Sequence, residues 1–417
     1  MLKRLALCAS LIVGGNALSF AENWGHWRGP AGNTAAIGAN PLTEFSGTKN
    51  VKWKVAIPGR GSGSPVVWDD RVFVVSAVPT NDGARGKLAF NTYCFDREAG
   101  TMKWQRTAVE AAPREGTHST NGYASASPCT DGKHVYSHFG SQGLYCYTLD
   151  GELVWKREDF GQMMTRNSFG EGSSPTLAGD LIIVPWDHEG PSFLYALNKL
   201  TGETVWKTAR DEPTCWATPL VISIGDRKQV VMNGQNYARS YDLETGKELW
   251  RCSGQTDRPA ASAIADDELV YIGSGFRGAF LGAFRPSGQG DIQRTQNVVW
   301  TIDRDTPDVA SPVLSGGRIY FYKGKSGLLT CVDAKTGKSH YSSQRIPGVN
   351  STYASPVAAG GHVYLTDRSG AITVIKDSEK LEVVAENQLG EPVDATPAPV
   401  DNQLFIRSES SLFCIAP

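Results

Sequence analysis

The side chains best suited to bind a ligand lie in short polar segments between apolar stretches of the sequence. Aromatic rings alternate there with basic residues, histidine and carboxylates, a combination that suits a polar ligand or a peptide. Twelve residues form the predicted site: Arg60, His118, Asn121, Arg166, Glu171, Trp186, Trp216, Arg258, Lys323, Tyr353, Arg368 and Asp394. Loops are also polar because they meet water, but Trp186 and Trp216 favour a site because they belong to no repeated pattern.

Motifs for the common catalytic chemistries do not occur in the sequence. We find no Walker-type loop, nucleophile elbow, zinc-ligand spacing or C-x-x-C-H haem motif. Glu171, Asn233, Asp308 and Asp394 could serve as metal ligands or as a base, but they occur in turns, where polar residues are expected anyway. The consecutive residues 186–189 (Trp, Asp, His, Glu) do not match known metal-ligand spacings. We therefore expect a non-catalytic protein and assign no cofactor or metal from these residues.

An internal repeat determines how the polar segments are positioned. A small residue followed by proline recurs, with one degenerate copy at Ser262, at intervals of 41 to 63 residues. The copies begin at Ser64, Ser127, Ser174, Thr218, Ser262, Ser311, Ser355 and Thr396. Several units then contain a glycine turn and end in a tryptophan, as at Gly202 and Trp206. Units of about 40–50 residues that contain four short strands are typical of propeller blades.

The two ends of the chain complete this count. Nearly continuous apolar runs such as 181–184 and 318–322 fit strands that are buried on both faces. The eighth unit stops after its third strand at residues 412–415, whereas residues 51–57 look like the missing tryptophan strand. Pairing the two would cover a sheet edge and close the ring. We therefore predict an all-β fold, a single propeller of eight four-stranded antiparallel blades over residues 51–417, preceded by a leader at 22–50.

The N-terminus predicts export. Lys3 and Arg4 precede an apolar stretch, and small residues at 19 and 21 fit a cleavage site, so residues 1–21 are typical of a signal peptide. No later apolar run approaches the length of a membrane-spanning helix. We expect a periplasmic or extracellular protein that is monomeric, with its ring closed within one chain.

Charge and cysteine usage restrict the partners further. The chain has 41 Lys and Arg against 43 Asp and Glu, which argues against nucleic acid as a partner because phosphate contacts need a basic surface. Cys94, Cys146, Cys331 and Cys414 occupy the same place in their units, and Ala196 takes that place in another. A position that accepts Cys or Ala is a small buried slot, so we expect free core thiols rather than disulfides.

Several repeats resemble a known family. Residues 198–206, 242–250 and 333–338 are similar to the tryptophan-docking repeat of quinoproteins, the bacterial propellers named after the pyrroloquinoline quinone (PQQ) dehydrogenases. The resemblance extends over about residues 51–417, and the opening at 24–33 is similar to the leader of exported PQQ-like repeat proteins. It implies that the repeated tryptophans pack between blades. The repeat also resembles the propeller subunit of the outer-membrane β-barrel assembly machinery, a periplasmic scaffold.

The family resemblance leaves two main functions open. It implies that a quinoprotein would hold PQQ between a central tryptophan and a disulfide of adjacent cysteines, beside a metal bound by a carboxylate and an asparagine. This sequence has no adjacent cysteine pair. We therefore expect an exported, non-catalytic binding or scaffold module for a protein or polar ligand. The alternative is a PQQ- and Ca²⁺-dependent oxidoreductase of alcohols or sugars with a diverged site, and the aromatic loops also leave a glycan ligand open.

Overall fold

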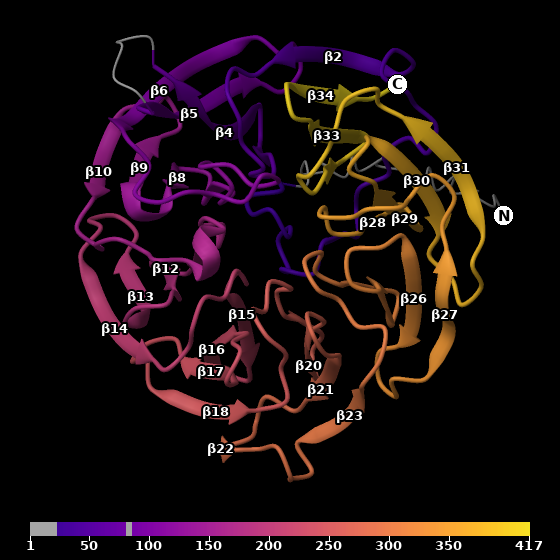
Figure 1. Ribbon diagram of the computed structural model, residues 1–417. Coiled ribbons are helices and arrows are strands. Elements are labelled where there is room, and N and C mark those ends of the chain that lie inside the picture. Colours follow the sequence, from indigo (N-terminus) through magenta and orange to yellow (C-terminus); the bar gives the residue numbers. More distant parts are fainter. Residues whose placement is uncertain (1–22, 81–85) are drawn as a thin grey trace, which may run out of the picture.

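Eight antiparallel sheets surround a central axis in the computed structural model, which describes residues 23–80 and 86–417 (Figure 1). The predicted signal peptide at 1–21 lies outside the described residues. The strands of each blade are given from the inner to the outer one. Blade 1 comprises β3 (Val66–Trp68), β4 (Arg71–Pro79), β5 (Leu88–Asp96) and β6 (Met102–Ala111), and blade 2 comprises β7 (Cys129–Thr130), β8 (His134–His138), β9 (Leu144–Thr148) and β10 (Leu153–Arg157). Blade 3 comprises β11 (Thr176–Ala178), β12 (Leu181–Trp186), β13 (Ser192–Asn198) and β14 (Thr204–Arg210), and blade 4 comprises β15 (Leu220–Ile224), β16 (Arg227–Met232), β17 (Ala238–Asp242) and β18 (Glu248–Cys252).

The remaining blades follow the same order. Blade 5 comprises β19 (Ile264–Ala265), β20 (Val270–Ser274), β21 (Phe280–Phe284) and β23 (Val298–Ile302), and blade 6 comprises β24 (Val313–Ser315), β25 (Arg318–Tyr322), β26 (Leu328–Asp333) and β27 (Ser339–Arg345). Blade 7 comprises β28 (Val357–Ala359), β29 (His362–Thr366), β30 (Ala371–Lys376) and β31 (Val383–Gln388), and blade 8 comprises β32 (Ala398–Val400), β33 (Gln403–Arg407), β34 (Ser411–Ile415) and β2 (Val51–Ala56). Short 3-10 turns lie at η1 (Gly140–Gln142) and η2 (Arg166–Ser168). No described helix is long and apolar enough to cross a membrane.

The predicted ring closure is confirmed. Strand β2 pairs antiparallel with β34, with Trp53 opposite Cys414 and Val55 opposite Leu412, so one blade combines both ends of the propeller (Figure 1). The cysteine prediction is also confirmed for the described residues, because all seven of their cysteines are free and buried.

The repeated tryptophans dock on the next blade, as the resemblance implied. Each indole N–H donates to a backbone carbonyl of the following blade, in the pairs Trp53–Arg97, Trp104–Leu149, Trp155–Lys199, Trp206–Leu243 and Trp300–Ala334. The ring packs on the glycine of that blade's turn: at Gly202, φ is 74°, and a Cβ would lie 2.7 Å from Trp155. Both facts favour glycine there, because the turn needs a positive φ and the ring needs the space.

Blade 4 ends differently. Trp250 donates to Gln229 of its own blade, and residues 285–295, an insertion in blade 5, cross to it. Within this insertion β22 (Gly290–Asp291) pairs parallel with β18 at the outer rim (Figure 1). The insertion therefore covers a sheet edge and does not cap the central mouth.

A ring of hydroxyl groups joins the inner ends of the blades. The side-chain oxygen of each of the eight repeat markers accepts a hydrogen bond from the backbone N–H of the marker before it. The donor–acceptor pairs are Ser64–Ser127, Ser127–Ser174, Ser174–Thr218, Thr218–Ser262, Ser262–Ser311, Ser311–Ser355, Ser355–Thr396 and Thr396–Ser64, at 2.9 to 3.3 Å. The last pair returns to the first blade, so the circuit is continuous.

The leader contacts every blade on the face opposite the polar loops, which we call the leader face. The contacts are Trp24 with Val67, Gly25 with Thr130, His26 with Thr176, Trp27 with Thr218, Asn33 with Ala265 and Leu314, Thr34 with Ala358, and Asn40 with Asp401. Its short strand β1 (Ala35–Ala36) pairs parallel with β28. In Figure 1 the indigo chain crosses the middle of the ring. The leader is thus packed into the propeller and closes its central channel.

Candidate functional site

The face that carries the polar loops, which we call the loop face, opens into a cavity on the axis. This cavity has a volume of about 390 Å³, and we call it the cup. Its wall contains the marker hydroxyls, including Ser127, Thr218 and Ser311. Its floor is Trp27 of the leader, whose indole N–H donates to Thr218 Oγ1 at 3.2 Å. Each marker hydroxyl accepts a backbone N–H and keeps its own proton as a donor. The eight-bladed frame therefore produces a cup that is closed at one end and lined with hydroxyl groups.

Cations at the rim of the cup are held by aromatic rings. The Arg258 guanidinium lies 3.4 Å from the Phe276 ring centroid, and that of Arg368 lies 4.3 Å from the Tyr353 centroid. Lys325 Nζ lies 5.1 Å from the same Tyr353 ring and 3.5 Å from its hydroxyl. Cation–π contacts fix the position of a charge and leave its N–H groups able to bind another partner. The rim thus combines aromatic surface with cations, of which Arg368 is bound to Asp394 whereas Lys325 forms no ion pair with a described carboxylate.

Arg258 shows this arrangement most clearly. Its side chain is almost buried, and its Nε has no hydrogen-bond partner among the described residues. Burial lowers the pKa of Arg258, and Asp308, at 3.6 Å, offsets that effect only in part. Its φ of 46° lies in the left-handed region, which a non-glycine residue adopts at a cost. The fold therefore holds a strained, incompletely partnered guanidinium at the cup.

The structure brings half of the predicted site residues to the cup. Six of the twelve line it: His118, Asn121, Trp216, Arg258, Tyr353 and Asp394. Arg368 is adjacent, because it stacks on Tyr353 and forms two hydrogen bonds with the Asp394 carboxylate, at 2.6 and 3.0 Å. The Thr120 hydroxyl lies 2.9 Å from the Tyr353 hydroxyl, so a loop of blade 2 reaches across the mouth to one of blade 7. Residues far apart in sequence therefore converge at one site.

Besides Arg368, three further predicted cations lie outside the cup. Arg60 lines a smaller neighbouring cavity with Arg368 and faces Glu409 at 3.7 Å. Arg166 donates to Gln235 Oε1 at 3.2 Å. Lys323 is half exposed and forms an ion pair with Asp305 at 2.7 Å. Lys325 lines the cup instead of Lys323.

Trp186 does not lie at the mouth. Strand β12 continues to this residue, which pairs with Phe193 of β13 and is 2% exposed. Its ring packs against Phe160 at a centroid distance of 5.3 Å. The aromatic side chain is accounted for by the core between blades 2 and 3.

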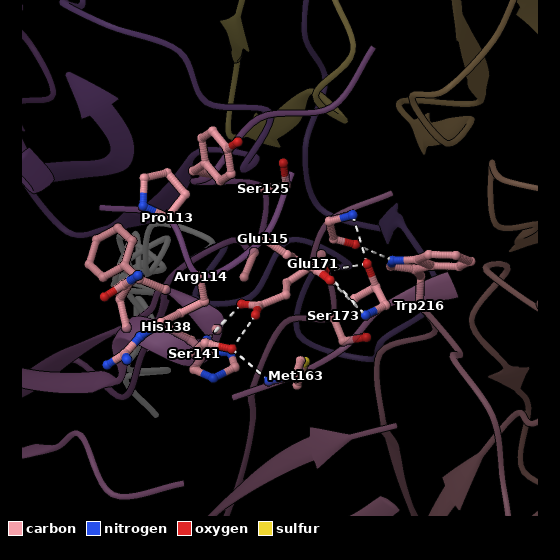
Figure 2. A pocket seen from close by; sticks show the side chains of 18 of the residues that line it. Pro113, Arg114, Glu115, Ser125, His138, Ser141, Met163, Glu171, Ser173 and Trp216 are labelled. Atoms are coloured by element: carbon pink, nitrogen blue, oxygen red, sulfur yellow. Dashed lines mark hydrogen bonds between the residues drawn. The ribbon is translucent and has the colours of Figure 1, made fainter. Parts of the chain in front are cut away.

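Glu171 lies in a side pocket next to the cup (Figure 2). Its carboxylate accepts hydrogen bonds from the backbone N–H of Ser141, at 2.7 Å, and from the Ser141 hydroxyl, which also accepts from Met163 N. Burial raises the pKa of Glu171 to about 7. His138 lines the same pocket, and burial lowers its pKa to about 4. Glu171 thus stabilises the short turn η1 and does not point to a metal.

The other residues considered as metal ligands also have structural partners. Asn233 donates to the backbone carbonyls of Ala261 and Gly273 at 3.0 and 2.9 Å. Asp308 faces Arg258, and Asp394 is held by Arg368. Among the described residues no group of three or more His, Cys, Asp or Glu side chains is placed to hold a metal ion.

Two parts of the cup were missed from the sequence. Trp27 belongs to the leader, whose sequence shares no pattern with the blades. The hydroxyl ring did leave a signal. Every marker residue is Ser or Thr, and Ser262 keeps its hydroxyl although Ala263 replaces the proline. The repeat thus retains the hydroxyl more strictly than the proline.

Comparison with known proteins adds a family and a set of similar folds. A family model described as outer membrane protein assembly factor BamB matches residues 15–158, 91–338 and 292–416. No curated protein sequence matches. BamB from Moraxella catarrhalis is 13% identical, with a TM-score of 0.58, over 88% of this chain and 96% of that one.

Two enzymes have similar folds. A europium-containing methanol dehydrogenase is 11% identical, with a TM-score of 0.63, over 95% of this chain and 98% of its own. The quinohemoprotein alcohol dehydrogenase of Comamonas testosteroni is 10% identical, with a TM-score of 0.64, over 94% of this chain and 80% of its own. At these identities the likeness concerns the fold alone.

Proposed function

This chain belongs to the PQQ-like propeller family whose model is described as outer membrane protein assembly factor BamB, and from that premise we propose that it is an exported, non-catalytic binding module. Its ligand is an acidic, aromatic-containing segment of a partner protein, which enters the cup from the loop face. The protein acts by holding that segment in place, as a scaffold subunit does.

The observation that carries this proposal is the supply of cationic donors at the cup. The Arg258 side chain donates no hydrogen bond to a described residue and contacts Asp308 only at 3.6 Å, and Lys325 contacts the Tyr353 ring and hydroxyl but forms no ion pair with a described carboxylate. A partly desolvated cation that is unpaired, as Lys325 is, or only loosely paired, as Arg258 is with Asp308 at 3.6 Å, gains more from a carboxylate than a solvated surface cation does. Phe276 and Tyr353 add aromatic surface beside the two charges. An acidic segment with aromatic side chains complements both features.

The shape of the cup also favours a short segment. A volume of about 390 Å³, closed by Trp27, has room for a few side chains rather than for a whole domain. The wider loop face would contact the rest of the partner. Loops on a rigid frame are suited to this role because the frame fixes their positions.

The similar folds of two dehydrogenases make a PQQ enzyme the second candidate. The residues present do not fit PQQ with its metal. Both Asp394 oxygens are bound by Arg368, Glu171 lies outside the cup and is bound by Ser141, and the described cysteines are all free. We therefore derive no redox step. PQQ-dependent dye reduction with alcohols or sugars, after addition of PQQ and Ca²⁺, would overturn the non-catalytic proposal.

Peptide binding tests the proposed function. We would measure the fluorescence anisotropy of a labelled heptapeptide of Asp, Glu and Phe and of its analogue in which Lys replaces the acidic residues. The acidic peptide should bind at least tenfold more tightly, and its affinity should fall with salt because ions screen the contacts at the rim. Equal affinities for the two peptides would refute the proposal.

Variants localise the binding. Arg258→Ala and Lys325→Ala should each lower the affinity for the acidic peptide at least fivefold, because each removes a cation from the cup. Lys335→Ala is the matched control, since Lys335 is an exposed lysine at an outer turn that faces Glu268. Equal weakening in the control would place the binding on general surface charge.

A further inference from the structure

A second cavity lies on the leader face, below the floor of the cup. It has a volume of about 450 Å³ and is lined by most of residues 23–32 of the leader and by residues at the inner strands of blades 1 to 5. The side chains of the leader alternate between the two cavities, because Trp27 lines the cup whereas His26 and Arg28 line the lower cavity. Consecutive leader residues thus line two cavities of different composition, and the Arg28 guanidinium lies 5.0 Å from the Trp27 ring centroid.

Arg28 is the distinctive residue of the lower cavity. It is 2% exposed, and it donates through Nε to Gly32 O at 2.8 Å and through Nη2 to Pro312 O at 2.9 Å. Its Nη1 has no hydrogen-bond partner among the described residues, and no described carboxylate forms an ion pair with it. Burial lowers the pKa of Arg28 to about 9. A buried guanidinium without a counter-charge is costly, and a bound anion offsets that cost.

His26 adds a neutral donor beside it. Burial, and then the charge of Arg28, lower the pKa of His26 to about 3. Its Nδ1 accepts the backbone N–H of Arg28 at 3.3 Å, so the proton resides on Nε2, 3.4 Å from Thr176 Oγ1. The imidazole is therefore uncharged at neutral pH, and Arg28 is the one charged side chain among the described residues that line the cavity.

The rest of the lining is mostly apolar. It includes Trp68, Leu177, Leu220 and Val221, and no acidic side chain is present among the described residues that line it. An apolar body would be buried against these side chains, and its charged end would meet Arg28. A cavity of this size, with few polar groups, suits a small molecule.

We infer that this lower cavity binds a small monocarboxylate with an apolar body, whose carboxylate forms an ion pair with Arg28. The site is independent of the proposed partner segment, because the lower cavity shares only Thr218 with the lining of the cup. The apolar body could be an alkyl chain or an aromatic ring, since either fits the lining described.

Calorimetric titration of the full mature chain tests this inference. The probes are octanoate for an alkyl body, 3-phenylpropanoate for an aromatic body and 1-octanol as the uncharged control. At least one carboxylate should bind, at least tenfold more tightly than octanol, and the better of the two identifies the body preferred. Failure of both carboxylates to bind, or equal binding of octanol, would overturn the inference.

Two variants assign the site. Arg28→Met should lower the affinity for the carboxylate probe at least tenfold. Ala31→Trp should also abolish binding, because Ala31 is an exposed residue that lines the cavity and a large side chain there obstructs it without removing Arg28 contacts. This second variant keeps the test decisive if Arg28→Met does not fold. Arg258→Ala should bind the carboxylate as the natural protein does, and loss of binding in that variant would place the ligand in the cup and refute the inference.

Discussion

The two ends of the central channel differ although one repeated frame builds the wall between them. At the loop face, loops of different sequence bring Arg258, Lys325 and Tyr353 to an open cup. At the leader face, a single non-repeated segment contacts all eight blades and closes the channel with Trp27. The repeat thus supplies rigidity, whereas the two non-repeated parts supply charge at one end and closure at the other.

The leader end should show the largest effect on stability. Trp24 is fully buried and pairs through its backbone with Val67, whereas Ile37 of the same segment is 97% exposed. Trp24→Ala should lower the free energy of unfolding by about 3–5 kcal/mol, because it leaves a cavity under the blades. Ile37→Ala is the control and should change it by less than about 0.5 kcal/mol. Denaturant unfolding measures both, and a small loss for Trp24→Ala would mean that the leader is only loosely attached.

The loop end should instead respond to pH. The pKa of Glu171 rises from 4.5 to about 7 on folding, so the native state retains a proton that the unfolded chain has lost. Stability from this group is therefore complete below pH 4.5 and is lost as the pH rises through about 7. The loss amounts to about 3 kcal/mol at about 1.4 kcal/mol for each pKa unit.

Glu171→Gln should remove that part of the pH dependence. Glu189→Gln is the matched control, because Glu189 accepts hydrogen bonds from Thr214 in a neighbouring loop and does not line the side pocket. Unfolding free energies measured from pH 4 to pH 8 compare the three proteins. A Glu171→Gln protein with the same slope as the natural one would show that Glu171 is ionised when folded.

The hydroxyl ring between the two ends should give the smallest effect. Ser127→Ala leaves the buried N–H of Ser64 without its acceptor at 2.9 Å, which should cost about 1–3 kcal/mol. Ser127→Thr keeps the hydroxyl and should recover most of that loss. Thermal unfolding of the two variants provides the comparison. Equal melting temperatures of Ser127→Ala and Ser127→Thr would show that the hydroxyl ring contributes no hydrogen-bond stability beyond side-chain packing.

The sequence predicted the frame better than the site. Blade number, docking tryptophans and ring closure follow from local patterns that recur at regular intervals. Lys323 was chosen although Lys325 lines the cup, because the path of a loop after strand β25 cannot be obtained from its composition. The apolar run at 181–184 predicts a strand that ends before Trp186, yet β12 continues to Trp186 and buries its ring. Trp27 reaches the axis through contacts with distant blades, which no local pattern records.

The central claim is that the cup is open at the loop face and attracts anions. Val309→Cys would place a thiol on the cup wall at a half-buried position, while the seven described natural cysteines are all buried. The rates at which an anionic and a cationic methanethiosulfonate reagent modify this thiol measure the local potential directly. Each rate is divided by the rate of the same reagent with a small free thiol; we predict that the anionic reagent is then several times faster than the cationic one and that the acidic peptide protects the thiol from both. Equal rates, or faster reaction of the cationic reagent, would contradict the account.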